Sequence, residues 1–210
     1  MTAKEKVWLN RAPLRNSSKK GEKSMGLFDL FKGSKSDPAD SVPQTDAEKW
    51  AVAAYALWSE YCGGSYKYFG GYEKNRSNAS MARGVLNRDW AVTNKQGVVE
   101  TVEYLIAEKN NAGDEAPKAA FNYGCAANIA ARGYLGGHLS KEEMMAETAK
   151  VAGVIRAHYH SWEEYAQAYI RGVGLESGVA DKVAEFEENY KRLVSMPDGP
   201  YTVDWDTPMV

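Results

Sequence analysis

The chain has 210 residues and a formal net charge of −2. A body of ~160 residues can bury one sizeable core without help from disulfides or a structural metal. Residues 1–36 hold nine Lys and Arg against three Asp and Glu, a net of +6, which leaves −8 for the rest of the chain. An acidic body argues against a general nucleic-acid-binding surface, so we predict no nucleic-acid partner.

The two cysteines, Cys62 and Cys125, lie far apart and lack metal-type spacing. A disulfide framework and a zinc site are therefore both unsupported, and free thiols suit a reducing cytoplasm. No apolar run approaches the ~20 residues that cross a bilayer, and the start of the chain lacks the ordered sections of a signal peptide. We predict a cytoplasmic protein with no membrane span.

Residues 1–44 are predicted to form a disordered basic tail, because they contain too few apolar residues to offset the entropy of ordering. The exception is the short apolar segment that begins at Met25. Its side chains would allow a weak peripheral contact with a membrane, or partner docking, through Leu27, Phe28, Leu30 and Phe31. We favour the alternative that the natural start is Met25, since a single helical turn is only marginally stable alone.

The first helix is expected to begin at the capping box Thr45–Glu48 and to stop at Gly63 and Gly64. Its apolar stripe runs from Trp50 to Tyr61. An aromatic loop with interleaved glycines follows and either packs over the core or lines a groove; its members are Tyr66, Tyr68, Phe69 and Tyr72.

A second helix is predicted over 78–88, and a third begins at the capping pattern of Thr93 and ends near Asn110. The fourth has Pro117 in its first turn and Gly133 at its C-terminal cap. Small residues crowd this fourth helix and would let neighbouring backbones come close. We therefore expect it at the centre of the fold.

Capping patterns at Ser140 and Ser161 begin two further helices, and the last long helix carries apolar residues from Val179 to Leu193 and ends before Pro197. Residues 201–210 are expected to lie extended over the body. Strand signals are nearly absent. The sequence therefore predicts an all-α fold, in which residues 45–210 form a single compact domain of six or seven mostly antiparallel helices with an extended C-terminal segment.

Three blocks of sequence resemble a bacterial domain-of-unknown-function family, number twelve sixty-six. The first is the run from Phe121 to Gly137, the second is Leu139–Glu143, and the third is Ser161–Tyr165 with Tyr169 and Gly172. Upstream, Leu86 to Trp90 resembles that family's Leu and Trp signature, and Pro200 to Asp206 resembles its C-terminal aromatic segment. The resemblance extends over about residues 50–210. It implies a bacterial origin and an all-α fold, and it supplies no activity.

One departure concerns charge. Family members often carry a Trp-Asp pair followed at helical spacing by Arg, whereas this chain has Phe121, Asn122 and Cys125 at the matching positions. If the Asp and Arg form a functional ion pair elsewhere, this chain has lost it. The structural family motif is Ser161, Trp162, Tyr169 and Gly172; Ser161 is expected to cap its helix and Trp162 to fasten the turn to the core.

The histidines and Cys125 give weak candidates. His158 and His160 flank one residue at a helix end, where a metal site would require the chain to have left the helix. Cys125 sits in an Ala-rich helix that suits a small buried thiol better than a nucleophile. We therefore predict no metal, no catalytic residue and no cofactor.

The polar residues Asn128 and Arg132 lie four apart on the small-residue helix and can act together, either in a structural hydrogen-bond network or in a ligand site that also involves His138. Function is not fixed by these patterns. The leading hypothesis is a non-catalytic protein-interaction module, for example one that neutralises or escorts an effector, with another protein as partner. The alternative is a small-ligand-binding protein or an enzyme with a pocket near Asn128 and Arg132.

Overall fold

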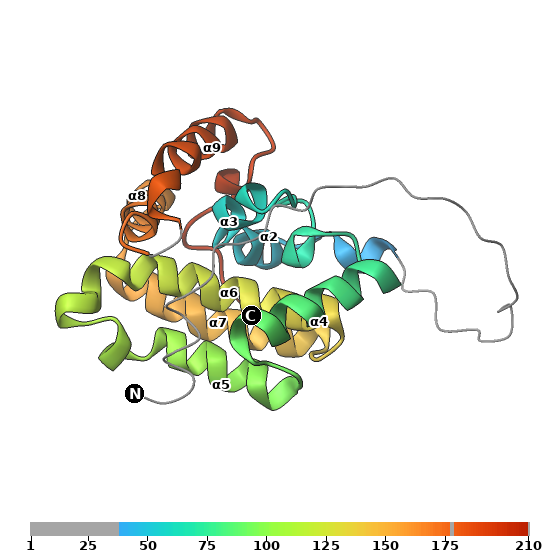
Figure 1. Ribbon diagram of the computed structural model, residues 1–210. Helices are drawn as coiled ribbons and strands as arrows, with labels where there is room; N and C mark the ends of the chain where they lie inside the picture. Colours follow the sequence, from blue (N-terminus) through green and yellow to red (C-terminus); the bar gives the residue numbers. More distant parts are fainter. Residues whose placement is uncertain (1–37, 177–178, 210) are drawn as a thin grey trace, which may run out of the picture.

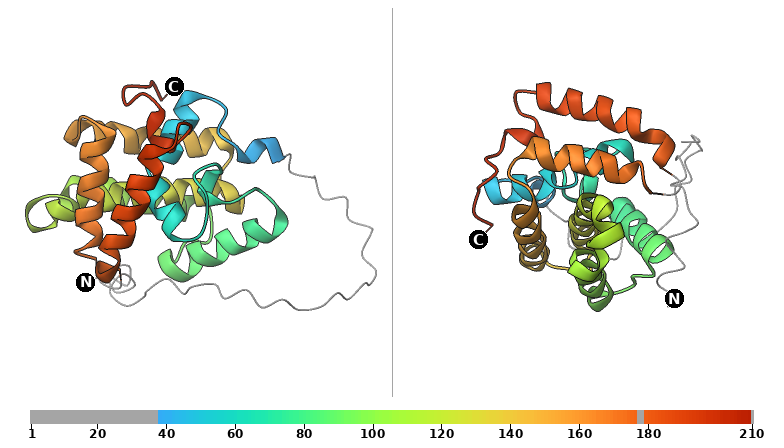
Figure 2. Two further views of the ribbon diagram at one scale, coloured as in Figure 1. Left: turned by 90° about the horizontal axis from the view of Figure 1, so that it is seen from above. Right: turned by 90° about the vertical axis from the view of Figure 1, so that its left-hand side faces the viewer.

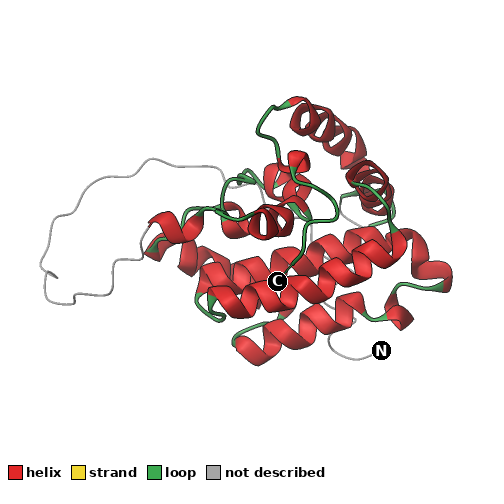
Figure 3. Ribbon diagram, turned by 180° about the vertical axis from the view of Figure 1, so that it is seen from behind, coloured by secondary structure: helices red, strands yellow, loops and turns green. Residues whose placement is uncertain are grey.

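The computed structural model describes residues 38–176 and 179–209 (Figure 1). This part of the chain folds into eight α-helices joined by loops and short 3₁₀ turns, and Figure 3 shows no strand in it. The helices are α2 (Asp46–Ala53), α3 (Ala56–Tyr61), α4 (Arg76–Trp90), α5 (Lys95–Ile106), α6 (Ala119–Gly136), α7 (Lys141–His158), α8 (Trp162–Val173) and α9 (Val183–Ser195). The all-α prediction is confirmed. The expected tail over 1–44 lies mostly outside the described residues.

The structure contains one helix more than the six or seven expected, because the predicted first helix breaks in its middle. Tyr55 has non-helical dihedrals, φ −127° and ψ 15°, and separates α2 from α3. The buried Tyr55 hydroxyl accepts a hydrogen bond from the Gly70 amide at 3.1 Å. The helical stripe of apolar residues continues through the break, so hydrophobic periodicity alone does not reveal it.

Helix α6 is the central element, as expected. Every residue of α6 except Asn122 is buried, and α6 contacts α4, α5, α7 and α8. A Cβ on Gly133 would lie 3.1 Å from Val98 of α5 and 3.2 Å from Leu139. Gly133 is therefore a close-packing position inside the helix, and the prediction that it caps α6 is wrong. The cap is Gly137, whose φ of 80° suits glycine.

The helices form two differently oriented groups. Seen from the side in Figure 2, α4, α5, α6 and α7 are viewed along their axes, whereas α8 and α9 lie across them. In Figure 1 the chain reverses direction between α5 and α6 and again between α6 and α7. Four residues, 91–94, connect α4 to α5, and four, 137–140, connect α6 to α7, as expected between antiparallel neighbours, whereas the twelve residues 107–118 separate α5 from α6.

Most of the helices predicted from capping patterns have a capping side chain at their N-terminus. Thr45 and Ser140 form complete capping boxes, and the Ser161 hydroxyl accepts from the Glu164 amide at 3.1 Å. At α5 the capping residue is Asn94 instead of Thr93, with its side chain accepting from the Gly97 amide at 2.9 Å. Asn and Thr are adjacent here, and both residue types occupy this position readily.

The packed structure begins ahead of the Thr45 capping box. Ser41 is 1% exposed, and its hydroxyl accepts from the Lys74 amide at 2.6 Å. The Tyr134 hydroxyl of α6 donates to the Asp40 carbonyl at 2.9 Å. Residues 40–44 are therefore in contact with the helical body.

Candidate functional site

The aromatic loop belongs largely to the core. Phe69 is 1% exposed and meets Tyr134 edge-to-face at 5.8 Å, and Tyr66 is 8% exposed. Tyr68 and Tyr72 are half-buried, and the Tyr72 hydroxyl donates to the Cys62 carbonyl at 3.1 Å. The loop was expected either to pack over the core or to line a groove, and Phe69 and Tyr66 pack over the core. A docking surface there would lack two of its four expected side chains.

The family motif residues have structural roles. Ser161 caps α8, and the Trp162 indole N–H donates to the Val203 carbonyl at 2.8 Å. A Cβ on Gly172 would lie 2.9 Å from the Cβ of Phe121, so glycine allows α8 to approach α6. Tyr169 is 1% exposed and packs its ring against Phe121 at 5.4 Å.

The positions that depart from the family pattern also have structural accounts. Phe121 is 4% exposed and contacts Trp58 edge-on at 5.8 Å. The Asn122 amide donates to the Asn111 side-chain oxygen at 2.9 Å. Cys125 is 5% exposed, and burial raises the pKa of its thiol. A thiol that is harder to ionise is a poor nucleophile.

The three histidines each have different neighbours, and none of these neighbours is Asn128 or Arg132. His158 stacks on Tyr123 at 6.0 Å, and the His160 amide donates to Glu164 at 2.7 Å. His138 lies at the turn after α6, where burial and then the Arg83 charge lower the pKa of its imidazole. In the described ranges, no three His, Cys, Asp or Glu side chains form a group that could hold a metal ion.

Asn128 and Arg132 are both buried on α6, at 4% and 7% exposed. Their spacing of four residues puts them on one face of the helix, about 5–6 Å apart at Cβ. The Asn128 Nδ2 and the Arg132 Nε are buried, and neither has a hydrogen-bond partner among the described residues. The two side chains thus bring unsatisfied donors to the same part of the interior.

The surroundings of Arg132 come from α3 and from the segment after it. The Arg132 side chain hydrogen-bonds the Cys62 thiol at the end of α3. Burial raises the pKa of Cys62, Tyr55 and Tyr72, and the positive charge of Arg132 partly offsets that rise in each case. All three groups are uncharged neighbours of a guanidinium that stays protonated in proteins.

Arg132 differs in its charge pairing from three acidic residues, of which Glu48 and Glu147 are buried and Glu60 is half-buried. Glu48 pairs with Lys141 at 2.6 Å, Glu147 with Lys150 at 2.8 Å, and Glu60 with Arg192 at 2.8 Å. No described carboxylate forms an ion pair with Arg132. Arg132 is thus a buried cation whose described partners are neutral.

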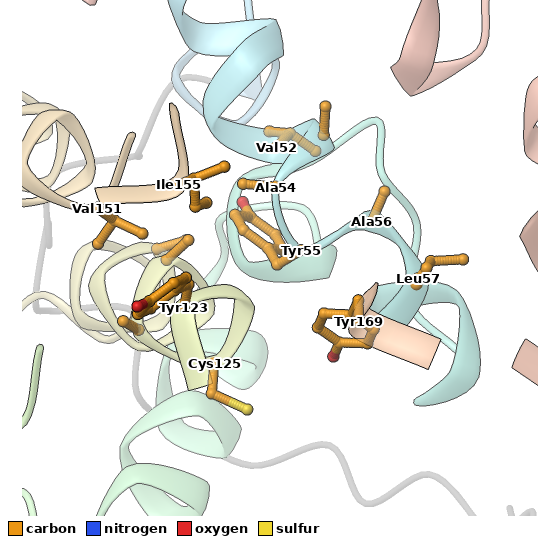
Figure 4. Close-up of a cluster of buried hydrophobic side chains, with 14 of the residues drawn as sticks. Val52, Ala54, Tyr55, Ala56, Leu57, Tyr123, Cys125, Val151, Ile155 and Tyr169 are labelled. Atoms are coloured by element: carbon orange, nitrogen blue, oxygen red, sulfur yellow. The ribbon is translucent and has the colours of Figure 1, made fainter. Parts of the chain in front are cut away.

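Two further unsatisfied groups lie on neighbouring elements, the Ser59 hydroxyl of α3 and the Tyr169 hydroxyl of α8. Burial raises the pKa of the Tyr169 hydroxyl well above its ordinary value, so this group stays protonated. Figure 4 shows Tyr55, Cys125 and Tyr169, from three different elements, within one buried cluster. We call Ser59, Cys62, Asn128 and Arg132 the arginine site.

Sequence reasoning found Asn128 and Arg132 and missed Ser59 and Cys62. The sequence signal that could have indicated these two residues is two glycine pairs, one before the aromatic loop and one within it. A Cβ on Gly64 would lie 2.8 Å from the Gly71 carbonyl, and a Cβ on Gly71 would lie 3.3 Å from the Ser59 hydroxyl. Two glycine pairs predict a close backbone approach, which here holds α3 against the returning chain.

Fold and site together define a helical protein whose central helix carries a buried arginine that forms no ion pair with a carboxylate of the described residues. Residues 111–205 match the family model described as protein of unknown function (DUF1266), so this part of the chain is similar to that family. The match is shorter than the expected 50–210 and leaves out the upstream signature at Leu86 to Trp90. It contains Asn128 and Arg132 but not Ser59 or Cys62. No curated protein and no solved structure matches the chain.

No helix in the described part of the chain is both long enough and apolar enough to cross a bilayer. The expected peripheral contact through Leu27, Phe28, Leu30 and Phe31 lies outside the described residues.

Proposed function

We propose that this protein binds a small anionic ligand, which presents a carboxylate or a phosphate to Arg132. The observation that carries the proposal is a guanidinium buried to 7% exposure with no carboxylate paired to it in the described chain. Removing a charge from water costs several kcal/mol unless a counter-charge and hydrogen bonds compensate. An anion that enters the site would supply both.

The donor chemistry of the arginine site supports an acceptor-rich ligand. Arg132 Nε and Asn128 Nδ2 can only donate, and the Ser59 hydroxyl can donate as well. The planar guanidinium fork matches a carboxylate or a phosphate with two parallel hydrogen bonds. Asn128, one turn before Arg132, adds a neutral donor at a fixed position. It would favour ligands that place a second acceptor within its reach.

The competing explanation is a purely structural hydrogen-bond network around Arg132. Such a network would be expected to satisfy its members, because a partly satisfied buried network is unfavourable. Three groups of the site keep unsatisfied atoms, namely Ser59, Asn128 and Arg132. A bound water or ion is one explanation for such unsatisfied groups, and an anionic ligand would satisfy the donors of all three residues.

The test is a thermal unfolding scan of the full chain with inorganic phosphate, citrate and adenosine monophosphate, each added separately. At least one should raise the melting temperature, and Arg132→Met should abolish that rise. Arg171→Met on the exposed surface of α8 is the matched control and should respond like the natural chain. A panel without any stabilising anion, or an Arg132→Met chain that responds normally, would refute the proposal.

The free energy of unfolding in the absence of ligand gives a second, independent test between the ligand site and the structural network. If Arg132 is held for a ligand, Arg132→Met removes an uncompensated charge and should leave the free energy of unfolding unchanged or raise it by about 1–4 kcal/mol. A structural role for Arg132 instead predicts a loss of about 3–5 kcal/mol. Urea denaturation of both chains measures the difference.

A further inference from the structure

Cys62 is the most exposed of the residues that surround the guanidinium of the arginine site. Arg132 and Asn128 are 7% and 4% exposed, whereas Cys62 is half-buried. The next residue, Gly63, is exposed, and a Cβ on it would meet nothing within 4 Å. Solvent therefore comes close to the chain at Cys62, while Arg132 lies inside.

Hydrogen bonds hold Cys62 in place. Cys62 directly follows the last residue of α3, and its amide donates to the Trp58 carbonyl at 3.0 Å. Its carbonyl accepts from the Tyr72 hydroxyl at 3.1 Å. The thiol has a hydrogen bond with the Arg132 side chain. The sulfur is thus kept next to a buried guanidinium.

Both helices that meet at this sulfur carry unpartnered donors. Arg132 Nε and Asn128 Nδ2 on α6, and the Ser59 hydroxyl on α3, are buried without a hydrogen-bond partner in the described parts of the chain. Ser59 lies three residues before Cys62, and Asn128 lies four before Arg132, so each pair shares a helix face. Oxygen atoms bonded to the sulfur would lie on the side of α3 and α6 that carries these donors.

The two cysteines of the chain differ in what opposes the effect of burial. Burial raises the pKa of the Cys62 thiol, the charge of Arg132 and its hydrogen bond lower that pKa, and the charge of Asp89 raises it. For Cys125, which is 5% exposed, burial also raises the pKa, and Arg132 opposes it only through its charge. The thiolate is the reactive form of cysteine, so Cys62 should react slowly but faster than Cys125.

We propose that Cys62 is a modification site, at which hydrogen peroxide oxidises the thiol to a sulfinate that takes Arg132 as its counter-charge. A sulfinate presents two oxygens as a carboxylate does, and the guanidinium fork can bond both of them. Oxidation thus gives Arg132 an anionic partner within the chain, which the carboxylates of the described residues do not provide.

The oxidation consumes one molecule of peroxide in each of two steps. In each step the sulfur attacks a peroxide oxygen, an S–O bond forms, and the O–O bond breaks. The leaving hydroxide takes up the proton of the thiol or of the sulfenic acid and departs as water. Sulfur loses two electrons, and the peroxide gains them. The first product is a sulfenic acid, and the second is a sulfinic acid, which loses its proton to solvent.

A sulfinate at Cys62 would also regulate the anion site. It would occupy the guanidinium to which the proposed function assigns a ligand, so the oxidised chain should no longer respond to added anions. This consequence rests on the proposed function, whereas the modification itself does not.

The first experiment treats the full chain with millimolar hydrogen peroxide and follows each cysteine by peptide mass spectrometry. Cys62 should gain two oxygen atoms, while Cys125 in the same sample gains none. Arg132→Met should slow the oxidation of Cys62 at least ~5-fold, and Arg132→Lys, which retains the charge, should recover part of the rate. Arg171→Met, on the exposed surface of α8, is the control and should react like the natural chain.

Two outcomes of this experiment would overturn the modification site. One is a Cys62 that stays unmodified or reacts no faster than Cys125. The other is an Arg132→Met chain in which Cys62 reacts as fast as in the natural chain.

A second experiment tests whether Arg132 pairs with an anion at position 62. Cys62→Asp places a carboxylate there without peroxide. Arg132→Met should lower the melting temperature by at least ~5 °C more in the Cys62→Asp chain than in the natural chain, because the carboxylate loses its counter-charge. An equal effect of Arg132→Met in both chains would refute the pairing.

The thermal unfolding scan with phosphate, citrate and adenosine monophosphate then tests the regulation. The oxidised natural chain should lose the rise in melting temperature that the untreated chain shows. Cys62→Ser cannot form a sulfinate and should respond equally before and after peroxide. A response that survives complete oxidation of Cys62 would overturn the regulation. An untreated chain without any response would contradict the proposed function, whereas the modification stands or falls on the first two experiments.

Discussion

At the scale of single residues, the molecule combines charges that have an ion-pair partner with a few buried polar groups that have no hydrogen-bond partner in the described chain. Lys141 neutralises Glu48, and the capping box supplies further hydrogen bonds that lower the pKa of that carboxyl. Arg132 and His138 lack such compensation: Arg132 Nε and His138 Nε2 are buried without partners in the described chain. We expect unpartnered groups of this second kind to make the stability of the protein depend on pH and, under the proposed function, on ligand.

His138 should make the protein less stable in mild acid. Its pKa in the folded chain is lowered from the ordinary value of about 6.5 by burial and then by Arg83, so the unfolded chain binds the proton more readily. Stability should therefore fall as the pH drops below ~6.5 towards the folded-state pKa. His138→Gln should reduce the loss of unfolding free energy between pH ~7.5 and ~5.5, as measured by urea denaturation.

Arg83→Gln provides a second variant, because it removes the positive charge next to the imidazole. Its acid sensitivity should fall between that of the natural chain and that of His138→Gln. If His138→Gln has the same pH dependence as the natural chain, His138 does not take up the proton that destabilises the fold.

At the scale of secondary-structure elements, the packing of α6 depends on residues without side chains. A Cβ on Gly124 would lie 2.4 Å from a Tyr169 ring carbon and 3.0 Å from the Tyr165 hydroxyl, so α8 would have to move away. In α7, by contrast, a Cβ on Gly153 would meet nothing within 4 Å. Glycine is thus required for close packing at position 124 of α6, whereas at position 153 of α7 it only lowers the stability of the helix.

Gly124→Ala and Gly153→Ala form a matched pair. The first should lower the free energy of unfolding by about 1–3 kcal/mol because the core is overpacked. The second should raise it by up to about 1 kcal/mol because alanine favours the helix. Chemical denaturation of both variants measures the signs, and a stabilised Gly124→Ala chain would contradict the close approach of α6 and α8.

At the scale of the whole molecule, α6 joins the two differently oriented groups of helices. It contacts α4, α5 and α7 in one group and α8 in the other, and carbonyls within residues 203–207 accept hydrogen bonds from side chains of α2, α7 and α8. Helix α9 is peripheral, since only Phe186 and Leu193 of its residues are buried. Loss of α6 would therefore remove most of the shared interior, whereas α9 can open locally.

Native-state hydrogen exchange should reflect this arrangement. Amides in the middle of α6, around Ala127 and Ala130, should exchange most slowly, at a rate set by global unfolding. Amides of α9 should exchange faster through local opening. Equal protection of α6 and α9 would show that the molecule has no such central element.

The sequence by itself determined the helical class, most helix starts and the central place of α6, because caps and small-residue runs act through local chemistry. It also selected Asn128 and Arg132, which share a face by spacing alone. Only the tertiary structure decided that Phe69 is buried, that Tyr55 breaks a helix, and that Cys62 contacts Arg132. These outcomes depend on contacts between segments far apart in the chain, and local patterns carry no information about which distant groups meet.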